Sequence, residues 1–320
     1  MASTQKTLHT CPLTPEQATK LRTLITGRGW EFAERPYTLY FAQKDKLTLA
    51  VYEKGPKLVL QGKGTAEFIE FILEPEILGV AQAGYEEVHA PEMFSPHFGV
   101  DESGKGDFFG PLVIAGCYVD ADIARTFMEA GIQDSKRIGS DQRIREFAAL
   151  IRNTRGATQS VVAIGPEKYN QLYEKFGNLN RLLAWGHARV IENLLEIRPD
   201  CPRALSDQFG NPRLIKNALL DKGRAIELEQ RTKAESDLAV AAASILARER
   251  FIDWLRAGKT TYGQELGRGV SAAVKASARS LVAAHGPAIL AKVAKTHFKT
   301  AHEIAPEHYH LKAAEGPGGE

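Results

Sequence analysis

The chain has 320 residues, of which 43% are hydrophobic and 25% charged, which is close to an ordinary globular protein and ample for a substantial buried core. Its length suggests two domains rather than one. The formal net charge is only +2. Bulk charge therefore does not indicate a nucleic-acid-binding protein, and any such function must rest on local clusters of charge.

Three cysteines, Cys11, Cys117 and Cys201, lie far apart in the sequence. They form no CxxC pair, so neither a zinc knuckle nor a disulfide framework is indicated, and we expect free thiols in a reducing compartment. No apolar segment approaches the roughly 20 residues needed to span a bilayer, and the N-terminus lacks the pattern of a secretory signal. We expect a cytoplasmic protein with no membrane partner.

The first 85 residues predict a small α+β domain. A helix begins after Thr14, a plausible N-cap, and ends at Gly27 or Gly29. Alternating apolar and polar residues then predict three strands, and a second helix follows. The strands are expected at 37–42, 46–52 and 57–64, and the helix at 65–79, with Phe68, Ile69, Ile72 and Leu73 on one face.

An acidic stretch with two prolines and no clear periodicity predicts a linker at 86–97. The second domain is expected at 98–312, and residues 313–320 predict a disordered tail. Strands and helices alternate in the second domain, which predicts an α/β fold with helices packed on a mixed sheet. Its strands are expected at 98–101, 112–119, 159–165, 204–206 and 225–230, and its helices at 121–131, 140–154, 178–196, 236–256 and 271–295.

The segment DESGKGD, residues 101–107, places two adjacent carboxylates at the end of an apolar strand. Their like charges repel near a sheet of low dielectric, and a divalent cation offsets that cost. Mg²⁺ suits such a site because it needs few protein carboxylates and keeps waters and phosphate oxygens in its shell. Alone, the segment is equally compatible with an acidic turn whose glycines allow positive φ angles.

Two further acids extend this candidate site. Asp207 follows the short predicted strand 204–206, where the end of a sheet would present it. Glu235 precedes the helix 236–256, where an acidic residue is also ordinary compensation of the helix dipole. Each acid by itself is more simply a loop or cap residue.

The order of these motifs resembles that of type 2 ribonucleases H over residues 98–300. The order is DESGKGD, then DSK at 134–136, then Asp207, then KAESDLAVAAASILARER at 233–250. The Gly-Lys-Gly loop, Glu235 as the fourth acid and the extra N-terminal residues resemble ribonuclease HIII rather than HII. The family implies a ribonuclease H-like fold, with an N-terminal domain similar to the TATA-binding protein.

The resemblance implies an endonuclease that hydrolyses the RNA strand of RNA/DNA hybrids and leaves 5′-phosphate and 3′-hydroxyl ends. Two divalent ions, Mg²⁺ or Mn²⁺, would be held by four catalytic acids: Asp101, Glu102, Asp207 and Glu235. The loop Ser103, Gly104, Lys105 and Gly106 is expected to bind nucleic acid and to detect the 2′-hydroxyl, which distinguishes RNA from DNA at the sugar.

Other lysines are candidate contacts to the substrate, although solvated lysines explain them about as well. Lys136 and Lys233 lie near the acids in sequence and would contact phosphate. The predicted N-terminal strands interleave lysines with aromatic residues, a pattern that suits a nucleic-acid-binding face. This pattern comprises Lys44, Lys57 and Lys63 near Tyr37, Tyr40 and Tyr52. His187 and Trp185, in the middle of a helix, are expected to be core residues.

Two alternatives remain open at the level of sequence. One is incision at single ribonucleotides in duplex DNA, as in ribonuclease HII, against which the Gly-Lys-Gly loop and the N-terminal domain argue. The other is a non-catalytic nucleic-acid-binding protein, which the loss of an acid would favour, whereas all four are present. A monomer is the expected state.

Overall fold

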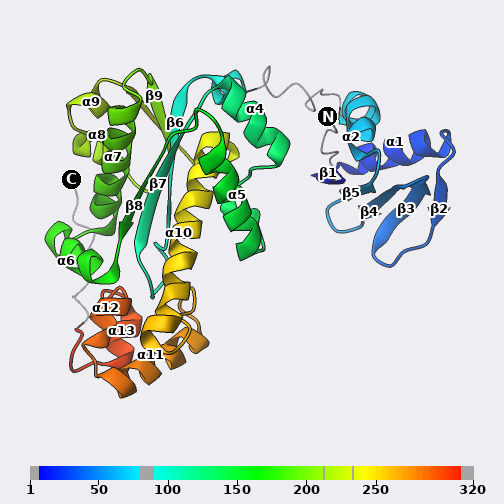
Figure 1. Cartoon of the computed structure of the whole chain (residues 1–320). Helices are drawn as coiled ribbons and strands as arrows, with labels where there is room; N and C mark the ends of the chain where they lie inside the picture. The colour runs from blue at the N-terminus through cyan, green and yellow to red at the C-terminus, as the bar shows by residue number, and fades with distance from the viewer. Residues whose placement is uncertain (1–6, 79–89, 212, 233, 311–320) are drawn as a thin grey trace. The chain divides into compact units, whose positions relative to one another are not determined.

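The computed structural model describes residues 7–78, 90–211, 213–232 and 234–310. The chain divides into two compact units, Met1–Glu92 and Met93–Glu320, which are described separately (Figure 1). Part of the predicted linker belongs to the second unit, because Phe94 in the 3₁₀ turn Pro91–Phe94 is buried in that unit's core. The predicted tail and residue Lys233 lie outside the described residues.

The first unit is a five-stranded antiparallel sheet with the strand order β1-β5-β4-β3-β2. Its strands are β1 Leu8–Pro12, β2 Glu31–Ala33, β3 Thr38–Lys44, β4 Leu47–Tyr52 and β5 Lys57–Gly62. The helix α1, Pro15–Thr26, begins at the predicted N-cap, where Thr14 and Gln17 form a capping box. The fold confirms the expected α+β domain.

Two features of the first unit differ from the prediction. The edge strands β1 and β2 are not predicted, because they are short and their side chains are largely exposed, so they show little apolar alternation. The second helix is regular only at α2, Thr65–Phe68, and continues as a π-helix over Ile69–Leu78. Phe68, Ile69 and Leu73 are buried as expected.

The second unit is built on a mixed sheet with the order β10-β9-β6-β7-β8. The pairs β6–β7 and β7–β8 are antiparallel, whereas β6–β9 and β9–β10 are parallel. The five strands are β6 His97–Ser103, β7 Leu112–Val119, β8 Gln159–Ile164, β9 Arg203–Asp207 and β10 Glu227–Arg231. All five lie where the sequence predicts strands.

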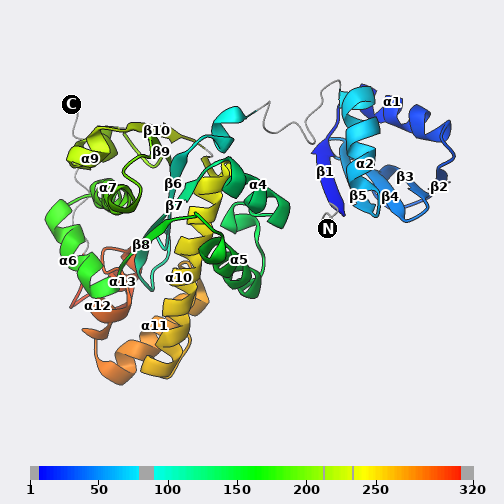
Figure 2. The ribbon, with the colours of Figure 1, turned by 45° about the horizontal axis from the view of Figure 1, so that its top comes forward.

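Two long helices cover opposite faces of this sheet (Figures 1 and 2): α7, Leu179–Ile197, and α10, Leu238–Tyr262. A Cβ at Gly99 would lie 2.1 Å from the backbone of Ala239 in α10, and one at Gly116 would lie 2.6 Å from Val190 in α7. The small residues of α10 at 239–247, almost all fully buried, permit this close approach. The mixed sheet with flanking helices confirms the predicted fold class.

The remaining helices pack around these layers. They are α4 Ala121–Ala130, α5 Asp141–Asn153, α6 Pro166–Phe176, α8 Arg213–Ala218, α9 Asp221–Arg224, α11 Ala272–His285, α12 Ile289–Val293 and α13 Lys299–Ile304. The helical stretch predicted around 271–295 is present as two helices, because Gly286, with φ +77°, and Pro287 end α11 before α12 begins. Among the described residues, no helix is long and apolar enough to cross a membrane.

Candidate active site

Asp207 ends β9, and Asp101 lies beside this end in the neighbouring parallel strand β6. Val100 lies opposite Ser206 in the β6–β9 register, so the two aspartates follow at the next position of each strand. Successive side chains of a strand point to opposite faces, and Gly99 contacts α10, so Asp101 and Asp207 lie on the α10 face. Asp101 is only 7% exposed. The strand alternation thus brings together two acids that are 106 positions apart.

The charges of these two aspartates are poorly compensated by the protein. Burial, and then the neighbouring Glu102, raise the pKa of Asp101 well above its ordinary value, against a backbone N–H donated by Glu102 at 2.8 Å. Burial also raises the pKa of Asp207, and Glu235 and Glu102 add to the rise. An added cation would relieve this electrostatic cost.

Glu102 faces the opposite side of the sheet and is well paired. The Nε2 of His187, in α7, lies 3.1 Å from the Oε2 of Glu102, and the Nδ1 lies 3.0 Å from the Oγ of Ser206. Lys105 Nζ lies 3.5 Å from the other carboxylate oxygen. Burial by itself would raise the pKa of Glu102, but the hydrogen bond and charge of His187, together with Lys105, lower it overall.

His187 is therefore a site residue that the sequence prediction leaves among core residues. It is fully buried, as expected, yet its ring joins the strand that carries Glu102 to the strand that ends in Asp207. A lone histidine among apolar helical residues indicates burial, and nothing in the sequence indicates which polar group it contacts. Its partner Glu102 is 85 positions away.

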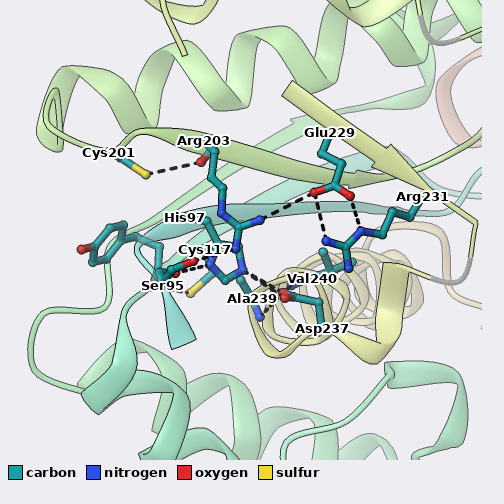
Figure 3. Close-up of polar contacts among 11 residues, drawn as sticks. Ser95, His97, Cys117, Cys201, Arg203, Glu229, Arg231, Asp237, Ala239 and Val240 are labelled. Atoms are coloured by element: carbon teal, nitrogen blue, oxygen red, sulfur yellow. Dashed lines mark hydrogen bonds and ion pairs between the residues drawn. The ribbon is translucent and has the colours of Figure 1, made fainter. Parts of the chain in front are cut away.

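Glu235 lies in the 3₁₀ turn Ala234–Ser236 at the start of α10. The backbone N–H of Ala234 donates to Asp207 at 3.3 Å, which ties this turn to the end of β9. Asp237 caps α10 through Ala239 N, and its carboxylate lies 3.0 Å from Nε2 of the buried His97 in β6 (Figure 3). The cap and the histidine fix the helix start, and with it Glu235, against the sheet.

A further acid near this site is fully compensated. Glu229 of β10 lies between two arginines, with Arg231 Nη2 at 3.0 Å and Arg203 Nη1 at 3.6 Å (Figure 3). The hydrogen bond from Arg231, with the charges of both arginines, lowers the pKa of Glu229 despite partial burial. Glu229 is therefore a salt-bridged structural residue, in contrast to Asp101 and Asp207.

Lys136 of the DSK motif lies beside the acids. Burial alone would lower its pKa, but Asp101, Asp134, Glu235 and Asp207 raise it overall. The motif is held against α10, because the Oγ of Ser244 accepts from Ser135 N at 3.0 Å. The exposed Lys136 thus supplies positive charge where a phosphate would approach the carboxylates.

The donor set suits a hard divalent cation, although the side chains do not enclose one. Within the described ranges, no three His, Cys, Asp or Glu side chains converge closely enough to hold a metal ion. Asp101 and Asp207 share one face of the sheet, whereas Glu102 is turned to His187 on the other. Mg²⁺ and Mn²⁺ accept oxygen ligands and leave positions for water and substrate oxygens, so an incompletely coordinated divalent cation fits these acids.

The N-terminal candidates divide between the two faces of their sheet. Lys57 lies directly opposite Tyr52 on the face away from α1, and both are exposed. Tyr40, by contrast, is buried beneath α1 and donates its hydroxyl to Ala18 O at 2.8 Å. Lys44 Nζ donates to Arg28 O at 2.7 Å near the end of α1. The expectation that Tyr40 and Lys44 belong to one face with Lys57 is therefore wrong.

The other two N-terminal candidates are surface residues. Tyr37 is 83% exposed and has a φ of +64° in the turn before β3. Lys63 is exposed in the turn after β5, where its backbone N–H donates to Lys46 O. Neither has a position in the sheet that assigns it to one face.

The mixed sheet, with Asp101 and Asp207 on adjacent parallel strands and a long helix on each face, is an arrangement of the ribonuclease H type. A family model described as Ribonuclease HII matches residues 98–301. Ribonuclease HIII of Protochlamydia amoebophila (strain UWE25) is 43% identical over 283 residues, covering 88% of this chain and 92% of that protein. Ribonuclease HIII of Chlamydia pneumoniae is 42% identical over 294 residues, 91% of this chain and 96% of that protein.

A solved structure described as Bst-RNase HIII in complex with Mn²⁺ shares the fold with a TM-score of 0.64 and 26% identity, over 94% of this chain and 99% of that one. The chain belongs to the ribonuclease HIII family and is a ribonuclease H endoribonuclease. The family resemblance read from the motifs is confirmed, and the alternative of a non-catalytic binding protein is wrong.

Proposed function

We propose that this enzyme hydrolyses the RNA strand of RNA/DNA hybrids at Asp101, Glu102, Asp207 and Glu235, with two Mg²⁺ or Mn²⁺ ions, and leaves 5′-phosphate and 3′-hydroxyl ends. The observation that carries the proposal is the pair of poorly compensated aspartates on the adjacent strands β6 and β9. When bound, the ions supply an activated water and stabilise charge on the leaving oxygen. The Mn²⁺ complex of the related Bst-RNase HIII supports a divalent cation.

The chain's own groups have separate tasks in this proposal. Asp101, Asp207 and Glu235 provide negative charge on one face, and Lys136 beside them attracts the scissile phosphate. His187 holds the Glu102 carboxylate through its 3.1 Å contact, so that the carboxylate keeps one orientation. The backbone of Gly104, Lys105 and Gly106, together with Ser103, is proposed to contact the sugar and its 2′-hydroxyl.

A cleavage assay with end-labelled RNA/DNA hybrid tests the proposal. We expect cleavage with Mg²⁺ or Mn²⁺. Cleavage should be lost in EDTA and should return when either ion is added in excess. The labelled ends distinguish 5′-phosphate from 5′-hydroxyl products. A duplex of DNA with one embedded ribonucleotide is the control, and we expect it to be cut much more slowly than the hybrid. Full activity in EDTA would contradict a metal-dependent mechanism.

We also propose that the face of the N-terminal sheet with Lys57 and Tyr52 holds the hybrid. Log K falls as log salt rises, and each lost phosphate contact should make this slope less steep by about 0.9. Lys57→Ala is expected to weaken hybrid binding and to reduce this slope, because the lysine lies on the face without helices. Lys20→Ala, an exposed lysine of α1, removes the same charge from the helical side and is the matched control. Equal slopes for both variants and the wild type would contradict this role.

A further inference from the structure

The Gly-rich loop of the active site is held by a C-terminal segment that no motif indicates. After the tip at Gly104–Gly106, the chain returns through residues 107–110, where Phe108 and Phe109 are fully buried. Phe109 forms an antiparallel bridge with Ala294, and Gly110 N donates to Val293 O at 2.9 Å. The returning part of the loop thus packs on residues 293–295, far along the chain.

Lys295 lies at the centre of this contact. Its side chain is fully buried, and Nζ donates to three carbonyl oxygens of the loop, those of Asp107 at 3.0 Å, Phe109 at 3.5 Å and Gly110 at 2.7 Å. The ammonium group has three N–H donors, so this set of acceptors uses all of them. The backbone of residues 107–110 therefore curves around one buried ammonium group.

A buried ammonium ion is a costly way to fill space. Burial lowers the pKa of Lys295 to about 7, so retaining the charged form near neutral pH costs free energy that an apolar side chain would avoid. The nearby ring of Tyr169, with its centroid 5.5 Å from Nζ, offsets part of this cost. What the lysine contributes in return is a fixed path for the backbone of residues 107–110, three of whose four carbonyl groups accept from its Nζ.

The carboxylate of Asp107 provides a second attachment. Its Oδ1 accepts from Gly269 N at 2.6 Å, and Gly269 O accepts from Phe108 N at 3.1 Å. The last residue of the DESGKGD segment is therefore bonded within the protein, which explains its presence in the motif without a role as a metal ligand. Both attachments lie immediately after the loop tip.

We infer that Lys295, supported by Asp107, is a positioning residue that sets how the Gly104–Gly106 backbone meets the sugar, and thereby the preference for RNA/DNA hybrid over DNA duplex. The inference rests on the proposed function of this loop. Lys295 does not itself reach the substrate, because it is fully buried. Displacement of the loop by about 1 Å is enough to lower catalysis up to about 100-fold.

The test compares Lys295→Met with the full-length wild type, well below the melting temperature of both. Two quantities are measured with Mg²⁺: kcat/KM on the hybrid, and Ki of a DNA duplex of the same sequence as a competitor. The variant is expected to lose about tenfold or more in kcat/KM, whereas Ki changes less than about twofold because phosphate contacts remain. Lys292→Met, at an exposed lysine of α12, is the matched control and should change neither quantity.

A second pair of variants covers the case in which Lys295→Met does not fold. Asp107→Ala should lose hybrid cleavage selectively, and Asp107→Asn, which keeps an oxygen acceptor for Gly269 N, should recover most of it. A lower melting temperature with both quantities unchanged would show a purely structural role and overturn the inference. A wild type that does not cleave hybrid would overturn the proposed function and this inference together. If the wild type cleaves hybrid selectively but the variants lose hybrid kcat/KM and duplex binding to the same extent, the inference alone is overturned.

Discussion

Replacement of Asp101 by Asn is expected to lower kcat on RNA/DNA hybrid by at least about 100-fold, the order seen when one electrostatic stabiliser of a transition state is removed. The substitution keeps the shape of a side chain that is only 7% exposed but removes the charge that would hold a cation. Asp207→Asn should act similarly. Asp122→Asn, at an exposed residue of α4, is the control and should retain wild-type activity. Wild-type rates in the Asp101 and Asp207 variants would contradict the assignment of the site.

The stability of the same variant separates loss of a ligand from unfolding. The folded-state pKa of Asp101 is raised, so the folded protein binds this proton more tightly than the unfolded chain. The metal-free wild type therefore loses stability as pH rises from the ordinary range of an aspartate through the raised pKa. Asp101→Asn lacks this loss. Melting curves in EDTA from pH 5 to about pH 8 should show the melting temperature of the variant rising relative to that of the wild type. A variant that is less stable than the wild type at every pH would contradict the electrostatic argument.

The strand ends of the site could be predicted from the sequence, whereas the partners of the acids could not. Apolar runs that lead into Asp101 and Asp207 predict that each aspartate lies at or near the end of a strand, and adjacent parallel strands bring such positions together. The contact of His187 with Glu102 depends on how α7 lies on the sheet. The contact of His97 with Asp237 joins positions 140 apart. Tertiary packing decides such pairs, and local periodicity carries no information about them.

The same limit applies to the N-terminal sheet. β3 carries Tyr40 and Lys44, and β4 ends at Tyr52, but which of them face α1 depends on the strand register and on an irregularity between Thr38 and Tyr40. A shift of one residue moves every side chain to the other face. Tyr40 therefore lies in the core although its neighbours suggested an exposed aromatic. The wide helical turns at 69–78 likewise keep a helical apolar pattern while their hydrogen bonding differs.

The two glycines of the loop tip are expected to respond oppositely to replacement by alanine. Gly104 has a φ of +85°, and a Cβ there would lie 2.2 Å from Pro111 O, so the protein itself requires glycine at this position. Gly104→Ala should lower the melting temperature, consistent with a cost of about 1–3 kcal/mol for a strained backbone. Gly106 has an ordinary φ, and a Cβ there would meet nothing within 4 Å. Nothing among the residues that the structure describes explains a glycine at 106.

Close approach of the substrate would explain it, as the proposed role of this loop requires. If the hybrid backbone lies against Gly106, an added methyl group should raise KM for hybrid about tenfold or more by displacing the sugar, while the melting temperature stays equal or rises slightly because alanine restricts the unfolded chain. Steady-state kinetics and melting curves for Gly106→Ala and Gly104→Ala test both halves. A Gly106→Ala enzyme with wild-type KM and kcat would show that the substrate does not touch this position, and the loop would then shape the site without contacting the RNA there.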